Sequence, residues 1–326
     1  MVGSHLLDFL LANSNWDIHG ICRWRSPLDN ISHHSDRINK QDRITLHFAD
    51  IRDYMSLQDI FSTNKFDFVF HLAAQSYPHT SFTSPNDTYV TNITGTENIL
   101  KSIQIHSPKA VVHVCSSSEV FGRVSPEFVP IVEDCRFHPA SPYAISKCGT
   151  DLIGRYYAEA FGINTQITRM FTHTGPRRGD VFMESSFAKQ IALIEQGYIE
   201  PSVLVGNLNS LRTIADVRDA VAAYYLAVTI DPAPGSYYNI GGNDSMSVKD
   251  VLKFLISIST MPNDISYEID ITRLRPIDAD LQIPDVTKFK CKTGWTPLYT
   301  AKDTLSDLLD YWRHKVKLNK GQFLQR

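Results

Sequence analysis

A tyrosine and a lysine at positions i and i+4 are the residues of this chain best suited to acid–base chemistry. Tyr143-Ala-Ile-Ser-Lys147 opens a segment with a helical pattern. Because these positions share a helix face, the ammonium can lie beside the phenol, lower its pKa and make it a usable base near neutral pH. The pattern alone is weak, since it fits equally well a tyrosine and a lysine on a helix surface.

Hydroxyl groups and a carboxylate precede this pair. Ser116-Ser117-Ser118-Glu119 follows an apolar run that is typical of a strand. In an open parallel sheet the ligand crevice lies at the carboxyl ends of the strands. We therefore expect Ser117 to meet Tyr143 there and to hydrogen-bond the substrate oxygen that gains or loses a proton.

Two arginines indicate the cofactor. After its second strand, a dinucleotide-binding fold offers an acidic residue to the ribose of NAD or an arginine to the 2'-phosphate of NADP. The corresponding stretch here is Arg23-Trp24-Arg25-Ser26, which contains no acid. Arg23 and Arg25 can pair with a phosphate, which favours NADP over NAD. The alternative is that both arginines are solvated surface residues.

The elements that must position these residues alternate as far as residue 170. Short apolar runs, rich in β-branched and aromatic residues, alternate with helical patterns, as in parallel strands joined by helical crossovers. We expect a doubly wound (Rossmann) α/β fold. The expected strands cover residues 17–22, 44–48, 66–72, 110–116 and 165–170, and the expected helices cover residues 6–12, 56–63, 86–105 and 144–161.

The pattern changes after Gly175, where Pro176, two arginines and Gly179 lead into elements that no longer alternate regularly. We expect a helix over residues 216–228, a short strand over 237–240 and a helix over 247–258 that Ser247 caps. The chain then divides into a dinucleotide-binding domain over residues 1–174 and a smaller substrate-binding region over residues 175–326, partly packed back on the first.

Composition restricts the classes of partner. The 326 residues include 43% hydrophobic residues and carry a net charge of -3, so a core is expected and a general attraction to nucleic acid or acidic membranes is not. The five cysteines show no CxxC pair or zinc-ligand spacing, which predicts no metal and a reducing, cytoplasmic compartment. No apolar run has the length of a membrane span, and the N-terminus has no signal-peptide pattern.

Taken together, these motifs resemble the extended short-chain dehydrogenase/reductases (the NAD-dependent epimerase/dehydratase family) from Val2 to roughly Tyr311. The matching segments, in family order, are Val2-Gly-Ser-His-Leu-Leu, Phe48-Ala-Asp50-Ile-Arg, His71-Leu-Ala-Ala-Gln-Ser76, Cys115-Ser-Ser-Ser-Glu-Val-Phe-Gly122, Ser141-Pro-Tyr143-Ala-Ile-Ser-Lys147 and Gly206-Asn-Leu-Asn-Ser-Leu-Arg212. Within that family, the segments most similar to GDP-mannose 4,6-dehydratases are His71 to Ser76, Pro176-Arg-Arg-Gly179, Gly206 to Arg212 and Arg275-Pro-Ile-Asp-Ala-Asp280. Ser186-Phe-Ala-Lys-Gln190 and Asp216-Val-Arg-Asp219 are also similar to GDP-4-keto-6-deoxymannose reductases.

The resemblance implies a nucleotide-sugar dehydratase, a hydro-lyase that converts GDP-mannose to GDP-4-keto-6-deoxymannose. Tyr143, assisted by Lys147, would remove the proton of the sugar C4 hydroxyl as hydride leaves C4, while Ser117 holds the oxygen. Glu119 would then remove the C5 proton and help to expel the C6 hydroxyl as water, before the hydride returns to C6. Glu119 discriminates between functions, because a reductase or a 4-epimerase has no C5 proton to move. The alternative is that Glu119 is a helix-start or loop residue that only makes the crevice polar and takes no part in the reaction. Ser117 stands in place of the threonine more usual in these dehydratases and retains the hydroxyl.

The resemblance also implies the residues that bind ligands. The cofactor would contact Gly3, Arg23, Arg25, Asp50, Ile51, Leu72, Ala73, Ala74, Gln75, Tyr143, Lys147 and His173, with Asp50 and Ile51 flanking the adenine. The nucleotide sugar would contact Ser76, Ser118, Thr172, Lys189, Arg212, Arg275 and Asp278. Thr172 replaces the asparagine usual before His173, and a basic residue typical of the dehydratases is replaced near Ser185-Ser186, which leaves the sugar and the base open.

The beginning of the fold differs from the expected pattern. A dinucleotide fold starts with a strand and a glycine-rich turn that hold the pyrophosphate. This sequence starts at Met1-Val2-Gly3, and Gly3 matches the third glycine of that turn, so we expect the first strand and part of the turn to be absent. Loss of a central strand would cost several kcal/mol against a total stability of about 5–15 kcal/mol. Either the true start lies upstream, which we favour, or the chain is a real truncation that is poorly folded or inactive.

Other functions stay open. A GDP-4-keto-6-deoxymannose reductase or a 4-epimerase would use the same hydroxyl and phenol. The missing turn also motivates a non-catalytic nucleotide-sugar binding protein, although such a protein has no need of Ser117, Glu119, Tyr143 and Lys147 together. A homodimer or homotetramer is expected, because members of the family commonly pair helices such as 86–105 and 143–161.

Overall fold

The computed structural model describes residues 1–274, 277 and 279–323. Its first part contains parallel strands close to the bounds that the sequence predicts. Strand β1 (Ile18–Cys22) pairs with β2 (Ile44–Phe48). Strands β3 (Phe68–His71), β4 (Val111–Cys115) and β5 (Asn164–Met170) pair side by side in that order. The predicted α/β fold with parallel sheets is confirmed.

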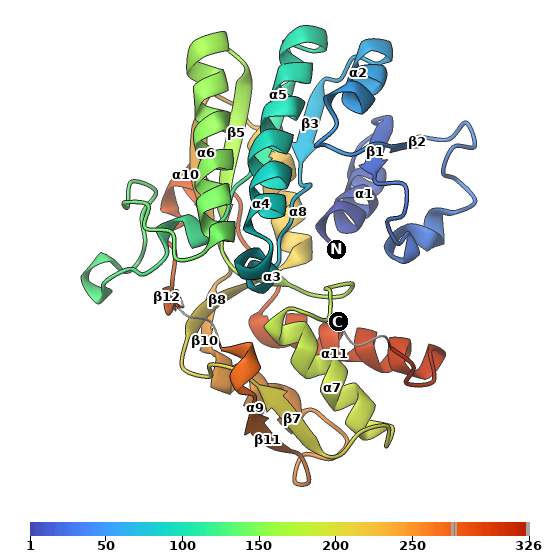
Figure 1. Cartoon of the computed structure of the whole chain (residues 1–326), viewed down its shortest axis with the longest axis vertical. Helices are drawn as coiled ribbons and strands as arrows, with labels where there is room; N and C mark the ends of the chain where they lie inside the picture. Colours follow the sequence, from blue (N-terminus) through green and yellow to red (C-terminus); the bar gives the residue numbers. More distant parts are fainter. Residues whose placement is uncertain (275–276, 278, 324–326) are drawn as a thin grey trace.

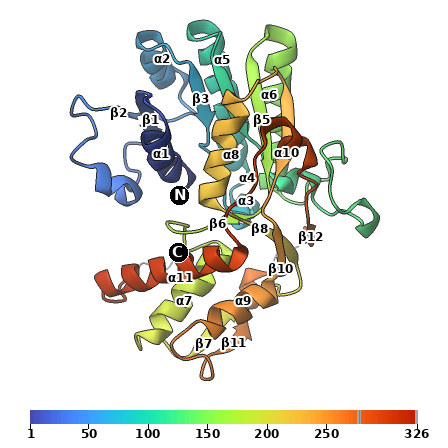
Figure 2. The ribbon, with the colours of Figure 1, turned by 180° about the vertical axis from the view of Figure 1, so that it is seen from behind.

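Helices cover both faces of these strands. Helices α2 (Tyr54–Thr63), α5 (Gly95–His106) and α6 (Pro142–Phe161) lie on one face, and α1 (Val2–Asn13) and α8 (Val217–Thr229) lie on the other (Figure 1, Figure 2). Leu57 and Phe61 of α2, Leu100 of α5 and Val112 of β4 share one buried cluster, which holds the first of these layers on the sheet. No helix in the described ranges is both long and apolar enough to cross a membrane.

Strands β1 and β3 are not paired with each other in the described part of the chain, so the strands of the first part form separate sheets. Side chains join the two sheets instead. Trp16 stacks on Phe68 with ring centroids 4.4 Å apart, and Leu6 and Leu10 of α1 pack with Val221 of α8 nearby. A doubly wound order places its first strand between these two strands. The absence of that strand stays a prediction.

The helix expected over residues 86–105 is interrupted. Two short helices, α3 (Pro78–Thr83) and α4 (Pro85–Tyr89), are followed by a π-helical turn (Val90–Thr94) that leads into α5. Such turns are rare and are frequent at functional sites. Hydrophobic periodicity cannot reveal one extra residue in a turn, so the sequence predicted an uninterrupted helix.

The second part has its own core. It contains α7 (Met183–Glu195), α9 (Val248–Ser257), α11 (Ala301–Leu318), β6 (His173–Thr174), β7 (Ser202–Val205), β8 (Leu211–Asp216), β10 (Asp244–Ser247), β11 (Ser266–Ile269) and β12 (Leu281–Gln282). Strand β8 lies between β10 and β12, and β7 pairs with β11. Phe187, Leu252 and Leu305 belong to a buried cluster that joins α7, α9 and α11. Ser247 caps α9 as predicted, because its side chain accepts the Asp250 N–H.

Three elements that follow residue 175 return to the first part. Strand β9 (Ser236–Ile240) pairs in parallel with β5, α10 (Thr287–Thr293) packs on β9, and α8 covers the sheet. The observed α8 and β9 agree closely with the helix and strand expected over residues 216–228 and 237–240. The chain therefore crosses between the two parts more than once.

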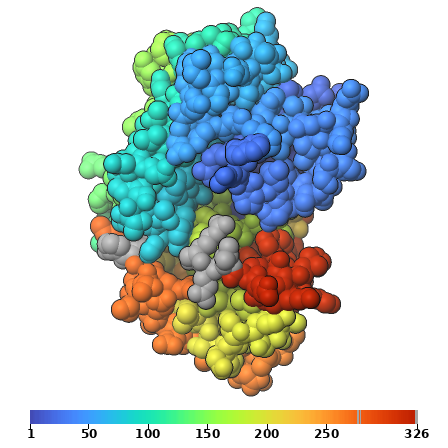
Figure 3. Space-filling model, turned by 45° about the vertical axis from the view of Figure 1, so that its right-hand side comes forward, coloured from blue at the N-terminus to red at the C-terminus, as the bar shows by residue number. Residues whose placement is uncertain are grey.

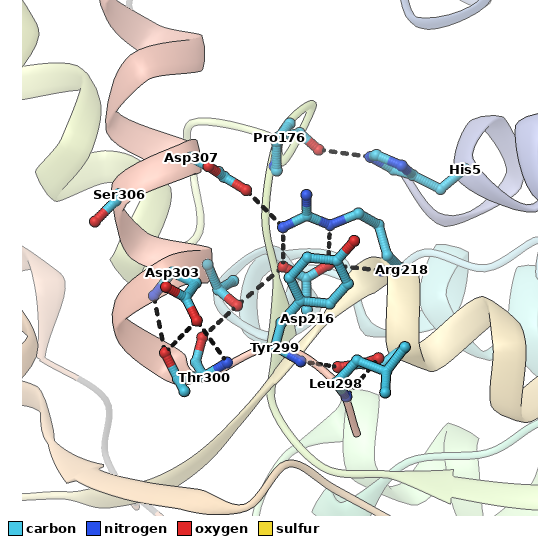
Figure 4. A network of polar contacts seen from close by, with 12 residues as sticks. His5, Pro176, Asp216, Arg218, Leu298, Tyr299, Thr300, Asp303, Ser306 and Asp307 are labelled. Carbon is cyan, nitrogen blue, oxygen red and sulfur yellow. Dashed lines mark hydrogen bonds and ion pairs between the residues drawn. The ribbon is translucent and has the colours of Figure 1, made fainter. Parts of the chain in front are cut away.

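A polar network joins the two parts where β8 leads into α8 (Figure 4). The Asp216 carboxylate accepts the Arg218 backbone N–H at 2.7 Å, pairs with the Arg218 guanidinium and accepts the Thr304 hydroxyl. Arg218 also pairs with Asp307 of α11 and lies over the ring of Tyr299. Because Asp216 is fully buried, this network fixes α11 to the start of α8.

A second polar cluster docks α1 on its neighbours. Nε2 of His33 and Nε2 of His34 lie 2.9 and 2.7 Å from Asp8 Oδ1, and Arg177 Nη1 lies 2.7 Å from Asp8 Oδ2. His5 Nε2, also on α1, lies 3.0 Å from the Pro176 carbonyl oxygen (Figure 4). The ligand atoms of Asp8, His33 and His34 converge as in a metal site, but the Arg177 guanidinium already neutralises the carboxylate and opposes a cation there.

Candidate active site

The end of β4 and the start of α6 bring the predicted catalytic residues together. Ser117 follows β4 and accepts the Glu119 N–H at 3.2 Å, which caps a short 3-10 helix (Ser118–Phe121). The Ser117 hydroxyl lies close enough to the Tyr143 phenol to lower the pKa of the phenol. Ser141 caps α6 by accepting the Ala144 N–H at 3.0 Å, which orients the turn that carries Tyr143. Ser117 and Tyr143 therefore meet at the strand ends, as their spacing predicts.

Burial dominates the acidity of Tyr143. Removal from water raises the pKa of the phenol well above its ordinary value, and the Glu119 charge raises it further. The neighbouring Ser117 hydroxyl and the positive charge of Arg178 lower it. Glu119 is thus close enough for its charge to act on the phenol, so one site contains two proton-transfer groups with different environments.

Lys147 lies one turn further along α6 and is 5% exposed. Its Nζ donates a hydrogen bond of 2.6 Å to the Cys115 carbonyl at the end of β4, and burial lowers the pKa of the ammonium. The structure places this ammonium on a backbone carbonyl, because a buried ammonium requires an acceptor and the strand end supplies one. Its position beside the phenol stays a prediction. Lys147 thereby fixes α6 on β4, and with it Tyr143 on Ser117.

Arg178 belongs to the site, although the sequence analysis assigned it no role. Its guanidinium carbon lies 3.4 Å from the centroid of the Phe182 ring, and its charge lowers the pKa of Tyr143. Burial and this same guanidinium lower the pKa of His173 to about 3, so His173 is neutral. The Arg178 Nε is buried and has no hydrogen-bond partner among the described residues. A buried guanidinium N–H that lacks an acceptor, close enough to the phenol to lower its pKa, is suited to an anionic or strongly polar ligand.

The loop that carries Arg178 is strained. Arg177 has a φ of 68°, in the left-handed region that residues other than glycine seldom adopt, and Gly175 has a φ of 139°. Strain of this kind is found where the surrounding structure fixes a functional side chain. The Pro176-Arg-Arg-Gly179 segment is the signal by which Arg178 could have been found.

Asn92, in the π-helical turn, is a second residue that the sequence analysis missed. Its Oδ1 accepts the Gln75 N–H at 2.8 Å, and its Nδ2 donates to the Gln75 carbonyl at 2.9 Å and to the Ser146 hydroxyl at 2.8 Å. Asn92 therefore ties the loop after β3, which contains the predicted cofactor contacts Leu72, Ala73, Ala74 and Gln75, to the helix that carries Tyr143. A polar residue on the buried face of an expected helix was the available signal.

A hydrogen-bonded turn places the two arginines beyond the end of β1. The Ser26 N–H donates to the Arg23 carbonyl at 2.9 Å. Within the described part of the chain, the side chains of Arg23 and Arg25 have neither a hydrogen bond nor an ion pair. The pKa of Asp50 is lowered by its hydrogen bonds with Arg52 and, to a smaller extent, by the charge of Arg23. The effect of Arg23 places this turn near Asp50, in the segment after β2. Two guanidinium groups that have no hydrogen bond or ion pair among the described residues fit a phosphate of a dinucleotide.

Other predicted cofactor contacts have protein partners of their own. Asp50 holds Arg52 through several hydrogen bonds, which include Nε to Oδ1 at 3.0 Å and Nη2 to Oδ2 at 2.6 Å. Ile51 is 7% exposed and packs on Gly95, where an added Cβ would lie 2.6 Å from Ile51 Cδ1. Gly3 lies in α1 with open space around the position of an added Cβ. The Ile51 side chain therefore supports this loop from the core.

The predicted substrate-binding residues are distributed over both parts. Ser118 is buried beside Ser117, and the Thr172 carbonyl accepts the Ala215 N–H. Lys189 of α7 is ion-paired with Asp180 at 2.9 Å. Ser76 lies in the loop after β3 and Arg212 on β8, and no hydrogen bond or ion pair among the residues described joins either of them to Lys189. Arg275 and Asp278 lie outside the described residues.

The surface is hollowed between the first part, coloured blue, and the second part, coloured yellow to red (Figure 3). Ser117, Glu119 and Tyr143 belong to the first part, whereas Lys189 and Arg212 belong to the second. A ligand held by both parts would present its reacting carbons to Tyr143 and Glu119. The arrangement can exchange a proton at a hydroxyl and a second proton at a nearby carbon.

Comparison with known proteins gives concordant results. Residues 1–308 match the family model described as GDP-mannose 4,6 dehydratase. The GDP-mannose 4,6-dehydratase sdnI of Sordaria araneosa is 29% identical over an alignment of 326 positions, which covers 94% of this chain and 58% of the length of that relative. The GDP-6-deoxy-D-mannose reductase of Pseudomonas aeruginosa is 29% identical over 251 residues, which cover 77% of this chain and 82% of the relative. The structure of RMD from Pseudomonas aeruginosa complexed with NADPH matches with a TM-score of 0.81 at 26% identity, and the match covers 97% of this chain and 96% of the RMD chain.

Proposed function

The chain belongs to the GDP-mannose 4,6-dehydratase family, as its motifs predict, and we propose that it converts GDP-mannose to GDP-4-keto-6-deoxymannose with NADP as its cofactor. One observation carries the proposal: the Ser117 hydroxyl and the Glu119 charge both act on the Tyr143 phenol. A hydroxyl and a phenol suffice for a reductase or an epimerase. The additional carboxylate supplies the second proton transfer that dehydration requires.

The protein residues act on the sugar in sequence. Tyr143 accepts the proton of the C4 hydroxyl, and Ser117 donates a hydrogen bond to the same oxygen as it becomes a carbonyl. Glu119 removes the C5 proton, which the new C4 carbonyl acidifies, and gives it to the C6 hydroxyl, which leaves as water. When bound, the nicotinamide dinucleotide would supply the redox chemistry, as acceptor of hydride from C4 and donor of that hydride to C6. The proton that Tyr143 accepted balances the proton that C5 regains, so the net change is the loss of one water.

Unpaired cations support the use of NADP. Arg23 and Arg25 are exposed beyond the end of β1, where the 2'-phosphate would lie, and their side chains have no hydrogen bond or ion pair among the described residues. The solved relative with 26% identity is a complex with NADPH, which is consistent with this choice. We assign residues 1–174 to the cofactor and residues 175–326 to the nucleotide sugar. Lys189 would reach a diphosphate only after it exchanges Asp180 for the ligand.

Assembly and location belong to the same proposal. Leu152, Tyr156 and Phe161 on α6 are large apolar residues that are more than one-third exposed. Their exposure on one helix supports a homodimer or homotetramer in which α5 and α6 pair between subunits. The five cysteines are free thiols, which supports a reducing compartment such as the cytoplasm.

A reductase of GDP-4-keto-6-deoxymannose is the second candidate, because a reductase matches 77% of this chain at 29% identity. The two functions differ in hydride balance. A dehydratase returns its hydride and consumes no NADPH, whereas a reductase oxidises one NADPH per product. A nucleotide-sugar binding protein would turn over neither substrate.

The test is to incubate the full chain with GDP-mannose and catalytic NADP, with Tyr143→Phe as the matched control. We expect a product lighter than GDP-mannose by one water, formed without net NADPH, and no product with Tyr143→Phe. Consumption of GDP-4-keto-6-deoxymannose with equimolar NADPH oxidation would instead establish the reductase. Binding of GDP-mannose without conversion of either sugar would establish the binding protein.

A further inference from the structure

The turn that carries Arg23 and Arg25 also presents an exposed tryptophan. Trp24 is 75% exposed and packs edge to face on Phe48, the last residue of β2, which is 51% exposed. Their ring centroids are 5.4 Å apart and their planes are inclined by 76°. The other three tryptophans of the chain are buried or half-buried. An indole left in water gains almost nothing from folding, so a pair of exposed aromatic rings indicates a ligand contact.

This aromatic pair lies where a dinucleotide would bind. Trp24 and Phe48 mark the carboxyl ends of the neighbouring parallel strands β1 and β2, which is the side of an open sheet that binds ligands. Trp24 lies inside the turn in which the Ser26 N–H donates a hydrogen bond to the Arg23 carbonyl. Trp24 therefore lies between Arg23 and Arg25 along the turn, and the guanidinium groups of these arginines have no hydrogen-bond or ion-pair partner in the described part of the chain.

One ligand class satisfies the cations and the indole together. In a 2'-phosphorylated adenosine, the phosphate and the base are attached to neighbouring carbons of one ribose. A phosphate held by Arg23 or Arg25 must then bring its base within a few ångströms of the same turn. Aromatic side chains stack on bases of any sequence, and adjacent arginines strengthen such contacts.

We propose that the indole of Trp24 stacks on the adenine of the cofactor, with Phe48 holding the indole in position. This inference rests on the proposed use of NADP and adds an aromatic contact to the ionic contacts of Arg23 and Arg25. The Phe48 contact lowers the entropy lost when the indole becomes immobilised on the base. Trp24 thus contributes to the affinity for the adenosine half of the cofactor and makes no contact with the reacting sugar.

The test measures binding of adenosine 2',5'-bisphosphate, which contains the base and the 2'-phosphate but no nicotinamide. In the full chain, Trp24→Ala raises the Kd of this probe by about 5- to 150-fold, the range expected for one base–aromatic stack, and Trp24→Phe restores most of the affinity. Nicotinamide mononucleotide, which lacks adenine, binds both variants as it binds the unaltered protein. Tryptophan fluorescence quenches when the bisphosphate binds, and Trp24→Phe removes most of this quenching while binding persists.

Two results would overturn the inference, and they can be told apart. If Trp24→Ala binds the bisphosphate with unchanged Kd while Arg25→Ala binds it weakly, the turn holds the phosphate without stacking the base, and the use of NADP stands. If the unaltered protein fails to bind the bisphosphate at all, both the stacking and the proposed use of NADP are wrong. Because Trp24 is exposed, its substitution leaves the thermal unfolding midpoint unchanged, which separates a loss of binding from a loss of fold.

Discussion

Protonation of buried histidines is expected to set the acid limit of stability. His71 and His113 are 6% and 0% exposed. Burial, and to a smaller extent neighbouring cationic groups, lower the pKa of each to about 3 from 6.5. Between these two values the unfolded chain binds protons that the fold does not, so stability falls as the pH falls through this window. Each histidine contributes a slope of about 1.4 kcal/mol per pH unit, and two pH units below 6.5 the pair removes about 5 kcal/mol.

The variant His113→Gln removes the contribution of one histidine to the pH dependence of stability. Glutamine keeps a neutral polar group near Thr168, which lies 2.7 Å from His113 Nε2, but it does not titrate. We expect the free energy of unfolding in urea, measured from pH 5 to pH 6.5, to depend on pH less steeply by about 1 kcal/mol per pH unit than in the unaltered protein, because the unfolded imidazole is only half protonated at pH 6.5. His314→Gln, at an exposed position, is the matched control and should keep the original slope. Equal slopes for His113→Gln and the unaltered protein would refute the assignment of a neutral buried imidazole.

Three further predictions follow from the described contacts. Asp216→Asn should lower the free energy of unfolding, measured in urea, by about 3 kcal/mol, because Asp216 is buried and is ion-paired with Arg218. Asp307 pairs with the same arginine but is 44% exposed, so Asp307→Asn should lower the free energy of unfolding by less than about 1 kcal/mol. Arg23→Ala should raise the Kd of NADPH by about 10- to 150-fold and leave that of NADH within about twofold, as fluorescence titration would show; an equal loss for both would exclude a 2'-phosphate contact. Arg178 lowers the pKa of Tyr143, so Arg178→Ala should move the acid limb of kcat/KM to higher pH, and an unshifted limb would separate Arg178 from the phenol.

The regular elements of the fold could be predicted because each is determined by local sequence. The strands of the first part are short apolar runs buried between helices, and β2 has the bounds that its sequence predicts. Ser247 and Ser141 begin their helices through side-chain caps, which are local signals. The pairing of β9 with β5 could not be read in the same way, since nothing in residues 236–240 specifies a partner so far away along the chain.

The candidate site was predictable to the extent that chemistry depends on spacing. Ser117 and Tyr143 meet because one follows a strand and the other opens the next helix. The positions of Lys147 and Arg178 depend on burial and on a strained loop, which leave no periodic signature in the sequence. Asn92 was hidden because a π-helical turn adds one residue to an otherwise regular helix.

The central claim, that Glu119 makes this site a dehydratase, is tested most directly by a single turnover of Glu119→Gln with stoichiometric NADP and GDP-mannose. In the unaltered protein, NADPH should appear transiently and disappear as the dehydrated product forms. Glu119→Gln keeps Tyr143 and Ser117, so NADPH should form and persist, while the dehydrated product forms at least about 100-fold more slowly. A dehydrated product formed at the unaltered rate, with NADPH still transient, would contradict the role of Glu119.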